Sequence, residues 1–168
     1  MFELVDNVPQ SLSYGLSADK PLALLSGNDI EHLQVALGAM YAGIPYCPVS
    51  PAYSLLSQDF AKLRHVCDLL QPGLVFVSDA AAYQRAIDAV LPAETPLISV
   101  RGHVPGRAQV SFASLLQTPG GSAADQAFNA TGPDSIAKFL FTSGSTKLPK
   151  AVITTQRMLC ANQQMLLQ

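Results

Sequence analysis

The feature that most constrains the fold is an alternation of short apolar runs with longer segments of helical periodicity, which begins at Pro21. Residues 21–27 (PLALLSG) form an almost unbroken apolar run, typical of a strand buried on both faces. The next segment carries apolar residues at helical spacing, namely Ile30, Leu33, Leu37, Met40, Tyr41 and Ile44. We expect Asn28, with Glu31 three residues on, to cap this helix and Gly43 to end it.

The alternation continues along the chain. Further strands are expected at 45–51, an edge strand because prolines bound it, and at 74–78, 95–100, 136–141 and 151–155. Further helices are expected at 54–70, 80–91, 111–117 and 156–168. This order predicts an α/β fold with a parallel sheet and right-handed crossovers. Residues 1–117 are expected to form one α/β subdomain, 118–134 a small polar loop or linker, and 135–168 the start of a second subdomain.

Composition narrows the class of protein. The 168 residues suffice for a domain with a core, but only 13% are charged, where about 25% is usual. We therefore expect part of the surface to lie against something else. The net charge of −2, without a basic block, argues against a nucleic-acid partner. We expect neither a signal peptide nor a membrane span, because no suitable apolar run is present.

The cysteines and histidines indicate no catalytic or metal site. Cys47, Cys67 and Cys160 lie far apart at no ligand spacing, which favours reduced thiols in a cytoplasmic protein. His32, His65 and His103 also lack ligand spacing, so we expect them on the surface and expect no metal.

Residues 139–152 (FLFTSGSTKLPKAV) concentrate the groups that chemistry could use. Hydroxyls come from Thr142, Ser143, Ser145 and Thr146, backbone approach from Gly144, and positive charge from Lys147 and Lys150. Such a turn suits a polyanion such as a triphosphate. The Walker, dinucleotide-binding and nucleophile-elbow patterns are all absent. By composition alone, an ordinary surface hairpin turn is an equal alternative.

The order of these residues resembles the phosphate-loop signature of the adenylate-forming superfamily, which includes acyl- and aryl-CoA synthetases, luciferases and peptide-synthetase adenylation domains. The matching residues are Thr142, Ser143, Gly144, Ser145, Thr146, Pro149 and Lys150, whereas Lys147 stands where the family usually has glycine. Residues 26–51 look like the first Rossmann-like subdomain of these enzymes. Residues 48–65 (PVSPAYSLLSQDFAKLRH) and 142–165 look closest to feruloyl-CoA synthetase-like acid–CoA ligases.

The resemblance implies an incomplete Rossmann-like parallel or mixed sheet, from the large N-terminal domain of an AMP-forming acid–CoA ligase. Such an enzyme uses ATP, Mg²⁺ and CoA to convert a carboxylic acid, here an aromatic one similar to a hydroxycinnamate, to its acyl-adenylate and then its thioester. Residues 142–147 and Lys150 would bind the ATP phosphates. The resemblance places no complete catalytic set in this chain, so the chain alone would be inactive. It could dimerise through surface exposed by truncation.

Two alternatives stay open: a truncated, non-catalytic nucleotide-binding or interaction module of the same fold, and a plain α/β domain whose turn has no function. The effect of Lys147 is also open.

Overall fold

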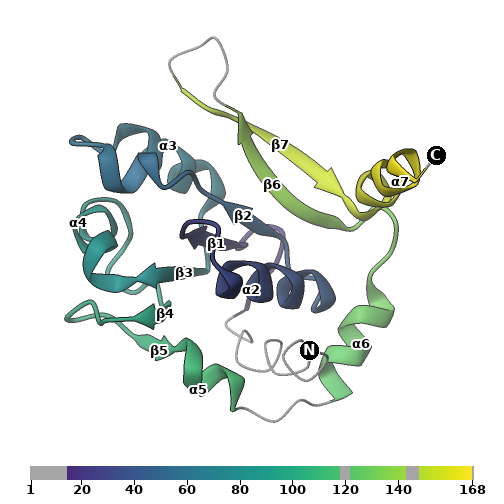
Figure 1. Ribbon diagram of the computed structural model, residues 1–168, viewed down its shortest axis with the longest axis horizontal. Helices are drawn as coiled ribbons and strands as arrows, with labels where there is room; N and C mark the ends of the chain where they lie inside the picture. The colour runs from purple at the N-terminus through teal and green to yellow at the C-terminus, as the bar shows by residue number, and fades with distance from the viewer. Residues whose placement is uncertain (1–14, 118–121, 143–147, 168) are drawn as a thin grey trace.

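A computed structural model describes residues 15–117, 122–142 and 148–167. Its centre is a seven-stranded sheet in the order β5-β4-β3-β1-β2-β6-β7 (Figure 1). The strands are β1 Leu22–Leu25, β2 Tyr46–Pro48, β3 Leu74–Asp79, β4 Leu97–Arg101, β5 Gln109–Ser111, β6 Ile136–Thr142 and β7 Lys150–Thr155. All neighbouring strands pair in parallel except β6 and β7, which are antiparallel. The predicted α/β fold with a mostly parallel, mixed sheet is confirmed.

Helices cover both faces of this sheet. They are α2 Ile30–Tyr41, the π-helical turn η1 Ala52–Leu56, α3 Ala61–Leu70, α4 Ala80–Val90, α5 Phe112–Leu116, α6 Ser122–Ala130 and α7 Gln156–Leu166. Strand β1 contributes alternate residues to two cores: Ala23 and Leu25 pack with α3 and α4, and Leu22 and Leu24 pack with α2 and α5. Because successive side chains of a strand point to opposite faces, its run of four apolar residues is buried throughout.

Helix α2 differs from its prediction at the start and in the face that it buries. Its N-cap is Asp29 rather than Asn28, and no side chain caps it. Its buried residues include Val35, Ala36 and Ala39, whereas Ile30 and Leu33 are 74% and 58% exposed. Helix α2 thus carries two overlapping apolar stripes, and periodicity alone cannot show which one is buried. The stripe with the small alanine residues faces the sheet, because it allows the helix to approach more closely.

The end of α2 agrees with the sequence prediction. Gly43 has φ +65°, a conformation that favours glycine after a helix. A Cβ atom there would lie 2.9 Å from Thr131 Oγ1, so this position also allows the close approach of the segment that follows α6.

The helix predicted over 54–70 is wrong in its first part. Residues 57–59 separate η1 from α3, and Phe60 has a left-handed φ of 54°. Ser57 Oγ accepts a hydrogen bond from Phe60 N at 2.9 Å, and Asp59 Oδ1 accepts one from Ala61 N at 3.1 Å. These local side-chain bonds replace helical ones, which is why a continuous apolar stripe did not give a continuous helix.

Strand β2 is not an edge strand, because it lies between β1 and β6. Val49 N donates to Leu24 O of β1 at 3.0 Å. Because backbone N–H groups alternate between the two sides of a strand, the backbone nitrogen of Pro48 faces β6. The pairing of β2 with β6 is confined to Tyr46 and Lys138. Pro48 therefore lies beyond the last residue pair between β2 and β6. A proline is tolerated in this interior strand because no hydrogen bond to β6 is required from its backbone nitrogen.

Residues 118–134, predicted as a loop or linker, contain helix α6. Ala124 is buried, and the ring of Phe128 stacks on that of Tyr41 with centroids 4.7 Å apart. Tyr41 Oη also donates to Asp125 Oδ1 at 2.7 Å. Contacts with α2 thus stabilise a helix that composition did not indicate. Beyond it, β6 joins the same sheet through β2, and the division into two subdomains stays a prediction.

Candidate functional site

The predicted phosphate loop connects β6 to β7. Thr142 ends β6, Lys150 begins β7, and the two are paired across the hairpin. Thr142 Oγ1 donates to Lys150 O at 3.5 Å, a long contact. The structure thus brings these two predicted site residues together, whereas Ser143, Gly144, Ser145, Thr146 and Lys147 lie outside the described residues.

This hairpin end has properties that fit an anionic ligand. It lies at the carboxyl end of β6, which runs parallel to β2, and open α/β sheets bind ligands at that edge. Thr142 and Lys150 are both exposed. Within the described ranges Lys150 makes no ion pair, so its ammonium group has no acidic partner there. A hydroxyl donor and a cation side by side suit phosphate oxygens.

One further residue at this hairpin was missed by the sequence prediction. His65, on α3, has Nε2 3.0 Å from Pro149 O. Because a carbonyl oxygen can only accept, Nε2 is the donor. His65 was expected on the surface, and it is instead half-buried. No local signal could have revealed the contact, because the two residues are 84 positions apart in the sequence.

His32 also departs from its expected surface position. Its Nδ1 lies 2.6 Å from Ser26 Oγ, just beyond β1, and Ser26 is buried. Burial lowers the pKa of His32 below its usual value, and the neighbouring Asp29 partly opposes this shift. The contact fixes the start of α2 against the end of β1.

The cysteines offer no activated nucleophile in the interior. All three are unpaired, and burial raises the pKa of both Cys47 and Cys67 to about 12. These two thiols therefore stay protonated at neutral pH. Among residues 15–117, 122–142 and 148–167, no group of three potential metal ligands was found. In the same residues no helix has the length and apolar character needed to cross a bilayer.

A groove of about 1210 Å³ lies between α2, α6 and α7, away from the hairpin end. Its lining is mainly apolar and includes Leu37, Met40, Phe128 and Cys160. None of the described hairpin-end residues contributes to its lining.

Comparison with known proteins gives the family. The chain belongs to the AMP-binding enzyme family, whose sequence profile matches residues 1–168. A search of curated proteins gave no significant match.

Solved structures share the fold. A luciferase-like enzyme from the nonluminescent mealworm Zophobas morio has a TM-score of 0.65 at 21% identity, covering 92% of this chain and 35% of that one. A structure from a study of the fatty acyl-adenylate ligases of E. coli and L. pneumophila has a TM-score of 0.64 at 24% identity, covering 96% and 27%. A malonyl-CoA ligase in complex with methylmalonyl-CoA and AMP has a TM-score of 0.64 at 20% identity, covering 96% and 28%. The chain therefore spans about a third or less of their length.

Proposed function

We propose that this chain is the phosphate-loop portion of an AMP-forming acid–CoA ligase. The observation that carries the proposal is the pairing of Thr142 with Lys150 at the carboxyl edge of the sheet, at the two ends of the Thr-Ser-Gly-Ser-Thr motif. Family membership and the similarity in fold to ligases support the proposal. A cytoplasmic location is proposed with it, supported by the three unpaired cysteines.

In the proposed reaction the carboxylate of the acid attacks the α-phosphate of ATP, giving an acyl-adenylate and pyrophosphate. The thiol of CoA then displaces AMP and forms the thioester. The hydroxyls of Thr142, Ser143, Ser145 and Thr146 would hold the β- and γ-phosphates, and Gly144 would allow close backbone approach. Lys150, and Lys147 in place of the usual glycine, would offset the negative charge of the leaving pyrophosphate. Mg²⁺ would neutralise further phosphate charge.

The acid substrate is proposed to be aromatic and similar to a hydroxycinnamate. This rests on the likeness of residues 48–65 and 142–165 to feruloyl-CoA synthetase-like enzymes. The chain by itself is proposed to be inactive, because the motif holds phosphates but supplies no complete catalytic set. Acyl-adenylate formed from ferulate and MgATP by this chain alone, detected by mass spectrometry, would contradict that part of the proposal.

The phosphate role is tested by binding of MgATP and of tripolyphosphate, followed by ³¹P NMR. Tripolyphosphate reports on phosphate contacts without any contribution from adenine. We expect both to bind, and we expect Lys150→Ala and Thr146→Ala each to weaken binding about two- to fivefold, the loss typical of an exposed polar or charged contact.

The matched control is Lys20→Ala, which removes one exposed positive charge just before β1, at the opposite edge of the parallel strands. This variant should bind both ligands as the unaltered chain does. An equal loss in Lys20→Ala would reveal non-specific charge attraction, and absence of tripolyphosphate binding would overturn the phosphate-loop assignment.

A further inference from the structure

We propose that His65 is a positioning residue that fixes the Pro149–Lys150 end of the hairpin, and with it Lys150, relative to α3. The proposal rests on the proposed function only where it concerns nucleotide binding. Its structural basis is the 3.0 Å hydrogen bond from His65 Nε2 to Pro149 O, which joins α3 to the beginning of β7.

Pro149 needs such a partner. It is buried, and as a proline it has no N–H, so the carbonyl is its one backbone polar group. A buried carbonyl without a hydrogen bond is costly, and a donor that satisfies it also fixes its direction. The next residue, Lys150, takes its position in β7 directly from this peptide group.

The donor is carried by a rigid element. Leu63, Val66 and Cys67 of α3 are buried in the core. Arg64, next to His65, donates from Nη2 to Ala89 O at 2.6 Å and so links α3 to α4. His65 can therefore hold the hairpin in place, because its own backbone is fixed on two sides.

The consequence concerns the arrangement of charge. Across the hairpin, the β6–β7 ladder already pairs Thr142 with Lys150. With Pro149 held by His65, this paired hairpin end also has a defined position relative to α3. Preorganised donors bind phosphate better than donors that must be ordered on binding.

The first measurement is amide hydrogen exchange of peptides covering residues 148–155, without ligand. His65→Phe retains a ring but removes the donor, whereas His65→Gln retains an amide N–H that can reach the same carbonyl. We expect faster exchange in His65→Phe and recovery in His65→Gln. The matched control, His103→Phe, alters an exposed histidine elsewhere and should exchange at the original rate.

The second measurement is the MgATP dissociation constant of the same variants. We expect His65→Phe to bind about three- to tenfold more weakly, His65→Gln to return to within about twofold, and His103→Phe to be unchanged. Circular dichroism of each variant verifies that the fold is kept. If His65→Phe does not fold, His65→Asn replaces it. Its amide is the same donor as that of His65→Gln on a side chain one methylene shorter, so the comparison tests whether the donor must reach Pro149 O.

The outcomes separate this inference from the proposed function. If His65→Phe and His65→Gln behave alike in exchange, the donor has no positioning role and the inference is overturned. If the unaltered chain binds neither MgATP nor tripolyphosphate, the proposed function fails, while the exchange comparison still decides whether His65 orders the hairpin.

Discussion

At the residue scale, His32 shows how burial shifts the protonation equilibrium of a side chain at the end of a strand. Ser26 Oγ and His32 Nδ1 lie 2.6 Å apart, and burial of the ring lowers the pKa of His32. The neutral imidazole is thus the form that the folded chain favours. The unfolded chain, in which the ring is hydrated, takes up a proton more readily.

This difference predicts a pH dependence of stability. Because the folded pKa lies below the usual value of 6.5, the unfolded state binds more protons, and the free energy of unfolding falls as pH falls through that value. The loss levels off below the folded pKa. His32→Gln should flatten this part of the profile between about pH 8 and pH 5.5, measured by urea unfolding.

The control for this pH effect is His103→Gln, because His103 is exposed in a loop. It should keep the profile of the unaltered chain. An unchanged slope in His32→Gln would show that other groups cause the pH dependence.

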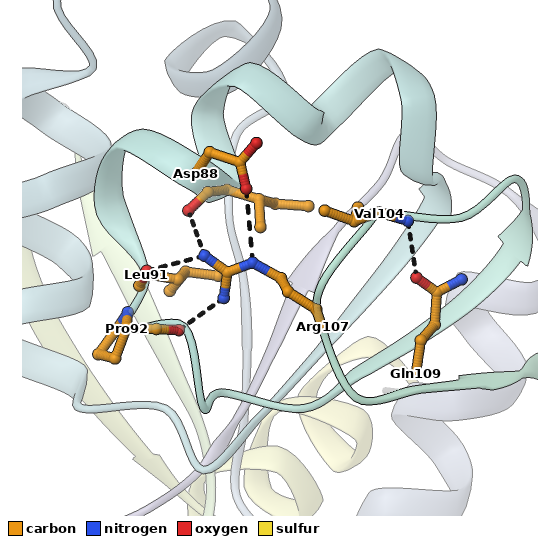
Figure 2. Close-up of polar contacts among 7 residues, drawn as sticks. Asp88, Leu91, Pro92, Val104, Arg107 and Gln109 are labelled. Atoms are coloured by element: carbon orange, nitrogen blue, oxygen red, sulfur yellow. Dashed lines mark hydrogen bonds and ion pairs between the residues drawn. The ribbon is translucent and has the colours of Figure 1, made fainter.

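At the scale of elements, Arg107 completes the C-terminal end of α4 (Figure 2). Its guanidinium donates to Pro92 O at 2.5 Å, Leu91 O at 2.9 Å and Ile87 O at 3.3 Å. A helix leaves its last carbonyls without partners, and a cation there also interacts favourably with the helix dipole. Asp88, 3.5 Å from Nε, is half exposed, so this ion pair adds little.

Arg107→Ala should lower the free energy of unfolding by about 2–3 kcal/mol. The Arg107 side chain is only 6% exposed, and its removal leaves three backbone carbonyls without their charged hydrogen-bond donor. Urea unfolding followed by circular dichroism measures the change. Arg107→Lys should recover part of it. The control is Arg101→Ala, whose side chain is 70% exposed and 3.8 Å from Asp79, and which should cost under about 0.5 kcal/mol. Equal losses in the two alanine variants would contradict the capping role.

Elements were predictable from the sequence where local chemistry and packing agree. Strand β3 has β-forming residues, and α4 is capped by Asp79, whose Oδ1 accepts a hydrogen bond from Ala82 N at 3.2 Å. Where packing overrides local preference, prediction failed. Helix α6 depends on the stacking of Phe128 on Tyr41. The break before α3 has a different cause, the local side-chain hydrogen bonds of Ser57 and Asp59, which the apolar stripe concealed.

At the scale of the whole molecule, apolar side chains are exposed on neighbouring elements. On α2 these are Ile30, Leu33 and Leu37, and Phe128 of α6 is half exposed. Helix α7 has no buried residue, and its Met158 and Met165 are exposed. Large exposed apolar patches favour association with another surface. The low charged fraction of the sequence led to the expectation that part of the surface lies against something else, and these exposed apolar residues are the ones that such a contact would cover.

We therefore expect this chain to self-associate through α2 and α7. Multi-angle light scattering over a concentration series should show a mass that rises with concentration. The double substitution Leu33→Gln with Leu37→Gln should reduce this rise, because it removes apolar area from the exposed face of α2. The control is Leu69→Gln, which alters an exposed leucine on α3 and should leave association unchanged. A monomer at all concentrations would contradict the prediction.

The sequence by itself determined the α/β class, the parallel sheet and most of its strands, because these depend on local periodicity and on short apolar runs. It also contains the motif on which the phosphate-loop prediction rests, which is contiguous from Thr142 to Lys150. Tertiary structure decided which face of α2 is buried, where β2 lies in the sheet, and that residues 122–130 are helical. It also brought His65 into hydrogen-bonding contact with Pro149. Each of these depends on contacts between residues distant in the chain, about which local spacing carries no information.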